Sequence, residues 1–170
     1  MGHIVLVGLM GSGKTTVGAA LAAVLGVPHR DSDIEIERET GLTGRQIAAR
    51  DGIDALHGLE ARHLLDALRR PGTTVISAAA STLDDPVCRA RMRARKHLVV
   101  WLRATPREIA ARLRNDDHRP DFGSDLAAVI AQQARTRTAA LRDVADLTLD
   151  ATRPPEELVA TIFTHADTVR

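Results

Sequence analysis

The sequence has few residues that form disulfides or stack against bases: its 170 residues include one cysteine, two phenylalanines, one tryptophan and no tyrosine. Because Cys88 is alone, no internal disulfide is possible, and the chain fits a reducing compartment in which this thiol is a small, semi-buried residue. The shortage of aromatic side chains argues against binding of single-stranded nucleic acid, which stacks its bases on such side chains.

Long apolar runs and an excess of charge of either sign are also absent. The stretch HIVLVGLM at residues 3–10 is too short to span a bilayer, and no charged segment precedes it as in a secretion signal. Lys and Arg number 23 against 22 Asp and Glu, so bulk electrostatics give no reason to expect a nucleic acid or a membrane as partner. We therefore expect a cytoplasmic monomer whose partner is a small molecule.

Short apolar segments alternate along the chain with segments of helical period. The segments expected to be strands are 3–8, 27–33, 73–78, 97–103 and 146–151. The segments expected to be helices are 16–26, 34–70 with interruptions around 41–44 and 52, 84–94, 106–114, 125–142 and 154–166. Near-continuous apolar strands are typical of a parallel sheet covered on both faces. The pattern predicts an α/β fold, a three-layer doubly wound domain with a five-stranded parallel sheet, spanning residues 1–170.

The strongest local pattern is GLMGSGKT at residues 8–15, which fits G-x-x-x-x-G-K-[ST] between a predicted strand and a predicted helix. Glycines let backbone N–H groups turn inward around a phosphate, and the following helix adds its N-terminal dipole. Lys14 can reach the β- and γ-phosphates, and the Thr15 hydroxyl can bind Mg²⁺. A chance glycine-rich turn is the alternative, which the strand and helix on either side disfavour. The residues predicted to bind nucleotide here are Gly8, Met10, Gly11, Ser12, Gly13, Lys14, Thr15 and Thr16.

A nucleotide site does not by itself define a reaction. The chain contains no N-K-x-D element for reading guanine, so ATP rather than GTP is the expected nucleotide. Its length fits a small kinase that transfers the γ-phosphoryl group to a hydroxyl.

Further motifs follow the phosphate loop in a characteristic order. They are DSD at 31–33, LHGLE at 56–60, VISAAAS at 75–81, VVWL at 99–102, an Arg-Pro at 119–120 and RTAALRDVAD at 137–146. In order and spacing the chain resembles the shikimate kinases, which belong to the nucleoside-monophosphate-kinase-like group of P-loop proteins. The resemblance extends from residue 3 to about residue 163. It implies ATP and Mg²⁺ as cofactors, acceptor-binding helices at about 34–70 and a lid at about 114–125.

The resemblance also implies roles for individual residues. Asp31 would hold Mg²⁺ together with Thr15, and Asp33 would orient the acceptor hydroxyl. Capping of the following helix is the alternative for this pair of acids, and one residue can do both. The implied catalytic residues are Lys14, Asp33 and Arg119, the last in the lid. Arg112 and Arg153 would lie near adenine, while Arg137 would bind an acceptor carboxylate.

Departures from the family pattern are concentrated at residues expected to contact the acceptor. Where the family has G-E-x-x-F-R-x-x-E, this chain keeps Gly52 and Glu60 but has Ile53, Leu56 and His57, the last replacing a carboxylate-binding arginine. The other departures are Ala78, Ala79 and Ala80 for three glycines, Asp121 and Phe122 in the lid, and Leu141 for a tyrosine. The residues predicted to bind the acceptor are Asp33, His57, Ala78, Ala79, Ala80, Arg119 and Arg137.

The three alanines follow a predicted strand, where open α/β sheets bind their ligands. They could open the next helix, or they could stand where a ligand comes close. If the family glycines adopt left-handed conformations, each alanine would cost about 1–2 kcal/mol, and the loop would then be expected to take another path.

Three functions are compatible with these observations. The first is a shikimate-kinase-like enzyme that phosphorylates a small polyol or cyclitol, an acceptor other than shikimate being allowed. The second is a genuine shikimate kinase with a variant pocket. The third is a non-catalytic ATP-binding protein, against which the retained Lys14, Thr15, Asp31, Asp33 and Arg119 argue.

Overall fold

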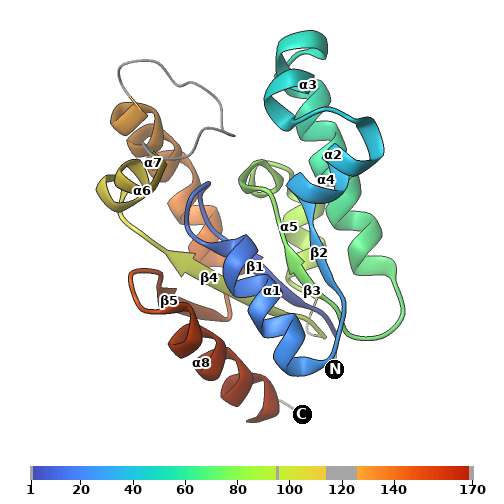
Figure 1. Ribbon diagram of the computed structural model, residues 1–170, viewed down its shortest axis with the longest axis vertical. Helices are drawn as coiled ribbons and strands as arrows, with labels where there is room; N and C mark the ends of the chain where they lie inside the picture. The colour runs from blue at the N-terminus through green and yellow to red at the C-terminus, as the bar shows by residue number, and fades with distance from the viewer. Residues whose placement is uncertain (1, 95, 114–125, 169–170) are drawn as a thin grey trace.

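A five-stranded parallel sheet forms the centre of the computed structural model, which describes residues 2–94, 96–113 and 126–168 (Figure 1). The strands are β1 (Ile4–Val7), β2 (His29–Asp31), β3 (Val75–Ser77), β4 (Leu98–Arg103) and β5 (Leu147–Asp150). Their order in the sheet is β2-β3-β1-β4-β5, and each neighbouring pair runs parallel. All five predicted strands are confirmed, and so is the α/β fold class.

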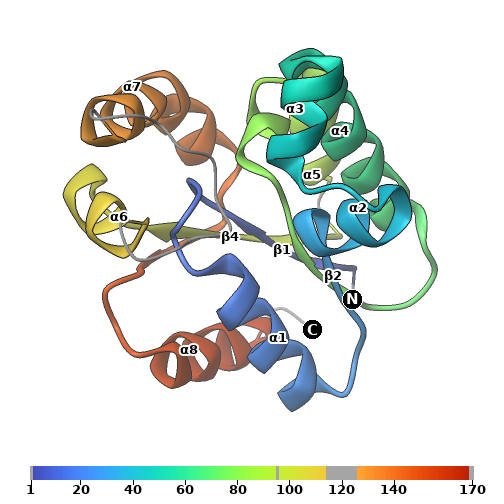
Figure 2. The ribbon, with the colours of Figure 1, turned by 45° about the horizontal axis from the view of Figure 1, so that its top comes forward.

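Helices cover both faces of the sheet, as Figure 2 shows most plainly. One face carries α1 (Lys14–Leu25) and α8 (Pro155–Thr168), and the other carries α4 (Ile53–Arg69), α5 (Pro86–Met92) and α7 (Leu126–Val144). The remaining helices are α2 (Ser32–Thr40), α3 (Gly44–Asp51), the short 3-10 helix η1 (Ala80–Leu83) and α6 (Pro106–Leu113). The three-layer doubly wound arrangement is therefore confirmed.

The run of apolar residues in β1 reflects burial from both sides. Ile4 and Leu6 pack among residues of α1 and α8, while Val5 and Val7 pack among residues of α4, α5 and α7. All four side chains are buried. Successive side chains of a strand point to opposite faces, so a strand covered on both sides is apolar at every position.

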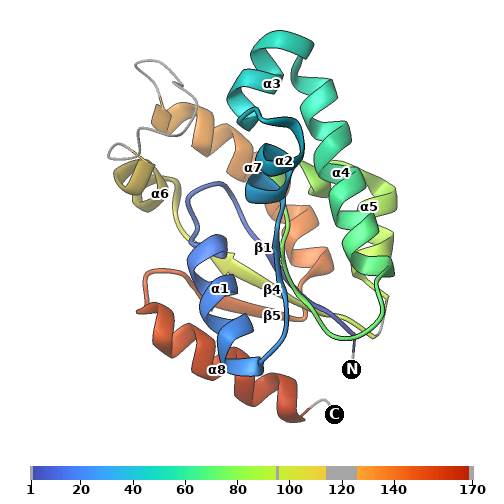
Figure 3. The same ribbon diagram turned by 45° about the vertical axis from the view of Figure 1, so that its right-hand side comes forward.

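The segment predicted to be helical from 34 to 70 forms the three helices α2, α3 and α4. In Figure 3, α3 stands beyond one end of the sheet and α4 runs from there along the face that it covers. Gly41 ends α2 in the left-handed conformation, at φ 71°. Thr43 then begins α3 with a capping box, because its hydroxyl accepts from the N–H of Gln46 and the Gln46 side chain accepts from the Thr43 N–H. The expected interruptions thus fall at the turns between α2, α3 and α4.

A polar cluster joins β2, α2 and α4 beneath these helices. Nε of Arg30 donates to both carboxylate oxygens of Glu35, at 3.0 and 2.9 Å, and Nε2 of His63 lies 3.0 Å from Oε2 of the same carboxylate. Burial alone would raise the pKa of Glu35, but the hydrogen bond from Arg30 holds it below its usual range. The cluster fixes the first turn of α2, which carries Asp33.

The structure also bears on two expectations drawn from composition, which concern membrane-spanning segments and the single cysteine. Within the described residues, no helix is both long and apolar enough to cross a membrane. Cys88 is a free thiol that is fully buried rather than semi-buried, and burial raises its pKa to about 12. A thiol with so high a pKa is a poor nucleophile, which agrees with its interpretation as a packing residue.

Candidate active site

The phosphate loop connects the carboxyl end of β1 to α1. Gly13 caps α1 with φ 95°, a left-handed conformation that only glycine adopts readily. A glycine cap has no side chain to satisfy the first-turn N–H groups, so they are left for an anion. Nζ of Lys14 donates to the carbonyl oxygens of Gly8 at 2.9 Å and Leu9 at 3.0 Å, within the loop itself.

Asp31 caps α2 and also contacts Thr15, the residue with which it is predicted to hold Mg²⁺. Its Oδ1 accepts from the backbone N–H of Asp33 at 3.0 Å and of Ile34 at 3.4 Å, which caps α2. Its Oδ2 accepts from the hydroxyl of Thr15 at 2.8 Å. The carboxylate that ends β2 is thereby held against the first turn of α1, beside the phosphate loop.

A cavity of about 240 Å³ opens between the phosphate loop and the helices α2 and α4. The predicted residues that line it are Met10, Gly11, Gly13, Lys14, Thr15, Thr16, Asp31, Asp33, His57, Ala79, Ala80 and Arg137. Residues on five separate segments are therefore brought together around one space, as the resemblance implied. The lining also includes residues that no sequence pattern marked as part of a site, namely Ser32, Ser77, Ser81 and Gln133. Ile53, Leu56 and Glu60 line it too, although comparison with the family pattern gave them no role.

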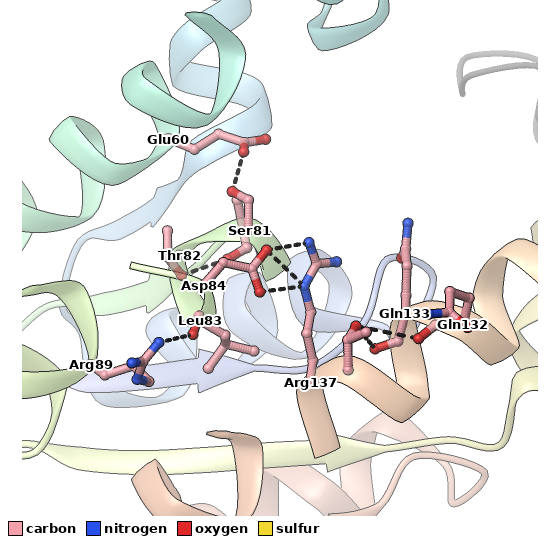
Figure 4. A network of polar contacts seen from close by, with 11 residues as sticks. Glu60, Ser81, Thr82, Leu83, Asp84, Arg89, Gln132, Gln133 and Arg137 are labelled. Carbon is pink, nitrogen blue, oxygen red and sulfur yellow. Dashed lines mark hydrogen bonds and ion pairs between the residues drawn. The ribbon is translucent and has the colours of Figure 1, made fainter. Parts of the chain in front are cut away.

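Glu60 is the most perturbed carboxyl group of the cavity. Burial raises its pKa to about 7, and the nearby negative charge of Asp33 adds to the effect, while the hydrogen bond from the hydroxyl of Ser81 opposes it. Figure 4 shows Glu60 reaching from α4 toward Ser81. The sequence did contain a signal, because Glu60 is one of two positions that match the family pattern between 52 and 60, but no role was attached to it.

The three alanines do not behave alike. Ala78 is 1% exposed and packs in the core, outside the cavity lining, whereas Ala79 and Ala80 line the cavity. Ala79 has φ −61° and ψ 145°, and η1 begins at Ala80. No residue other than glycine has positive φ in the described part of the chain, so the three alanines carry no left-handed strain. Ala80 opens a short helix, as one of the two readings expected, and the close approach of a ligand to Ala79 and Ala80 stays a prediction.

Arg137 forms an ion pair with the carboxylate of Asp84. Its Nε donates to Oδ1 and Oδ2 of Asp84 at 3.1 and 3.2 Å, and its Nη2 donates to Oδ2 at 2.6 Å. In Figure 4 the guanidinium reaches from α7 to the end of η1. No local sequence pattern indicates this pair, because the two residues are 53 positions apart.

A second cavity, of about 460 Å³, lies on the other side of the phosphate loop. It brings Arg112 and Arg153, the two arginines that the resemblance places near adenine, together with Ser12. Arg112 donates to the carbonyl oxygens of Gly11 at 3.3 Å and Ala151 at 2.5 Å, so it also ties α6 to the phosphate loop. The Ser12 hydroxyl is buried and lacks a hydrogen-bond partner among the described residues, which leaves it for a ligand.

Arg119 and the segment predicted to be a lid, about 114–125, lie outside the described residues. Their roles stay predictions.

Comparison with known proteins agrees with this geometry. A family model described as "SKI: Shikimate kinase" matches residues 10–167. The chain belongs to the shikimate kinase family. It is 36% identical over 165 residues to shikimate kinase 2 of Sodalis glossinidius, which covers 95% of this chain and 93% of that protein.

Solved structures of shikimate kinases share the fold over nearly the whole chain. Shikimate kinase from Acinetobacter baumannii in complex with shikimate superposes with a TM-score of 0.90 at 27% identity, covering 99% of this chain and 94% of that one. Shikimate kinase from Bacteroides thetaiotaomicron gives a TM-score of 0.87 at 26% identity, covering 98% of each chain.

Family membership and the intact phosphate loop define the class of reaction. The protein is an ATP-dependent phosphotransferase that uses an alcohol group as acceptor. The expectation of a shikimate-kinase-like kinase is thereby confirmed, and a non-catalytic ATP-binding protein loses its support. The comparisons favour a genuine shikimate kinase over a kinase for another polyol, which was the first of the three functions.

Proposed function

We propose that the acceptor is shikimate and that this protein is a shikimate kinase with a variant acceptor pocket. The observation that carries the proposal is one cavity in which Asp33, His57, Glu60 and Arg137 lie beside the phosphate loop. Hydrogen-bonding groups for several hydroxyls and basic groups for a carboxylate are what a hydroxylated ring acid requires. The similarity to a shikimate-bound kinase over 99% of the chain supports the same acceptor.

Two departures from the family pattern carry less weight than the sequence suggested. Ala78 and Leu141 are both buried in the core beneath the site and are not part of the cavity lining. Substitutions there change packing without presenting a new group to the acceptor. The departures that do line the cavity are Ile53, Leu56, His57, Ala79 and Ala80, and among them only His57 stands where the family has an arginine.

In this proposal one group of residues binds the phosphates and another orients the acceptor hydroxyl. The N–H groups of the phosphate loop and the ammonium of Lys14 bind the phosphates and stabilise the charge that develops on them. Asp33 accepts a hydrogen bond from the attacking hydroxyl and aims it at the γ-phosphorus. Because catalysis of this reaction is mostly positioning and charge stabilisation, an orienting carboxylate is sufficient.

The oxygen groups next to the phosphate loop fit a magnesium ion. The Thr15 hydroxyl and the Asp31 carboxylate lie 2.8 Å apart, and hard oxygen donors of this kind are the ligands that Mg²⁺ prefers. Thr15 would hold the ion directly and Asp31 through water. When bound, the ion supplies neutralisation of the phosphate charge.

A panel of acceptors tests the proposal. ADP release is measured with shikimate, quinate, gluconate and an uncharged cyclitol, and Lys14→Ala serves as the inactive control. We expect saturable turnover with shikimate and a kcat/KM at least about tenfold above that of any other acceptor. Preference for the uncharged cyclitol would overturn the proposal and restore the changed-acceptor hypothesis.

A further inference from the structure

The pair of Asp84 and Arg137 stands at the acceptor side of the cavity. Both carboxylate oxygens of Asp84 accept from one edge of the guanidinium, formed by Nε and Nη2. The Arg137 side chain is 12% exposed and the Asp84 side chain 50% exposed, so solvent reaches the pair from the carboxylate side. Arginine binds a carboxylate in a bidentate manner through two N–H groups on one edge of its guanidinium. In Arg137 the edge formed by Nε and Nη2 already binds Asp84.

The charges around Arg137 also weaken its attraction for the carboxylate of an acceptor. Asp31, Asp33 and Glu60 line the same cavity, and Asp84 adds a fourth acidic side chain near them. Opposite these acids, the acceptor side of the described cavity offers Arg137 and His57. The carboxylate of an acceptor in this cavity would therefore approach Arg137, whose positive charge is already balanced by Asp84.

We propose that Asp84 determines acceptor specificity by balancing the charge of Arg137, so that the chain binds the acceptor's carboxylate weakly. This inference rests on the proposed function, in which Arg137 receives that carboxylate. Asp84 competes for one edge of the guanidinium and repels the incoming charge. The same contact orders Arg137, which leaves its remaining N–H groups positioned for hydroxyl or ester oxygens.

The test compares two ligands that differ in one charge. Binding of shikimate and of its methyl ester is measured by calorimetry, in the presence of ADP and Mg²⁺, for the wild type and for Asp84→Asn. The asparagine keeps the shape of the side chain and one acceptor oxygen but removes the charge. Asp85→Asn is the matched control, since Asp85 caps α5 through its side chain, and asparagine caps a helix equally well.

Asp84→Asn is expected to lower the Kd for shikimate about three- to tenfold and to leave the Kd for the methyl ester unchanged. Asp85→Asn is expected to change neither. In an Arg137→Gln background the effect of Asp84→Asn on shikimate should disappear, because the charge being balanced is gone. If the only role of Asp84 were to hold η1 against α7, its substitution would change the Kd for shikimate and for the methyl ester by the same factor.

The outcomes separate this inference from the proposed function. Equal effects on both ligands, no effect, or no shikimate binding by either protein overturns the role of Asp84. Turnover of shikimate by the wild type is scored separately and decides the proposed function. Selective tightening in Asp84→Asn without turnover by the wild type would support the specificity role while contradicting shikimate as the acceptor.

Discussion

Replacing Glu60 by glutamine should change how stability depends on pH. The pKa of Glu60 lies at about 7 in the folded protein against 4.5 for an unperturbed glutamate, mainly because the group is buried. Between these values the folded protein holds a proton that the unfolded chain releases, so rising pH favours unfolding. The stabilisation is full below pH 4.5 and is lost as the pH rises through 7.

The size of the effect follows from the separation of the two pKa values. Each pKa unit corresponds to about 1.4 kcal/mol, so the difference between 4.5 and about 7 amounts to about 3 kcal/mol. Glutamine is neutral throughout this range and carries no such dependence. The free energy of unfolding of Glu60→Gln, minus that of the wild type, should therefore rise by about 3 kcal/mol from low to high pH. For a chain of this length that equals a relative shift in Tm of roughly 6–12 °C.

Urea unfolding of both proteins at closely spaced pH values from 5 to 8.5 gives this difference directly. Other titrating groups contribute equally to both proteins and cancel. Glu37→Gln, on the exposed side of α2, controls for the loss of one negative charge at the surface. A difference that stays flat across this range would refute the assignment of a raised pKa to Glu60.

Three further substitutions test the site and the packing beneath it. Asp33→Asn should lower kcat at least about 100-fold while leaving ATP binding intact, which ADP release and nucleotide titration measure together. His57→Arg should lower the KM for shikimate about tenfold, because it adds a charge-assisted donor facing the cavity. Gly18→Ala should destabilise the fold by about 1–3 kcal/mol in urea unfolding, since a Cβ there would stand 2.5 Å from Nε2 of His29 and 2.7 Å from Oγ of Ser77.

Each of these expectations has an outcome that would contradict it, and Gly18→Ala also has a control variant. Gly58→Ala in α4 adds a Cβ that meets nothing within 4 Å, so it should stabilise by about 1 kcal/mol through helix propensity alone. Equal destabilisation by Gly58→Ala and Gly18→Ala would contradict the crowding at α1. Wild-type turnover in Asp33→Asn would remove its orienting role, and an unchanged KM in His57→Arg would show that residue 57 does not approach the acceptor's carboxylate.

Much of the fold is encoded in local patterns. The apolar run of β1 is buried on both faces, and the alternation of such runs with helical periods predicts the parallel sheet. The phosphate loop is predictable for the same reason, since its strand, glycines and helix are contiguous. The capping of α2 by Asp31 and its contact with Thr15 were within reach too, because both follow from its place at the end of β2.

What escaped prediction depends on contacts between distant segments. Ala78 and Ala79 are neighbours of identical chemistry, yet one packs in the core and the other lines the cavity. The pairing of Asp84 with Arg137 joins η1 to α7, and no local pattern reports it. The pKa of Glu60 is set by burial between α4 and η1, which the sequence does not display.

Direct detection of the product tests the central claim most simply. Purified wild-type protein is incubated with Mg²⁺, ATP and shikimate, and ADP and phosphorylated shikimate are quantified together by ³¹P NMR and mass spectrometry. The account predicts one phosphorylated shikimate for each ADP formed, and neither product with Lys14→Ala. ADP formed at the same rate without shikimate, or no phosphorylated shikimate beside active transfer to an uncharged cyclitol, would contradict it.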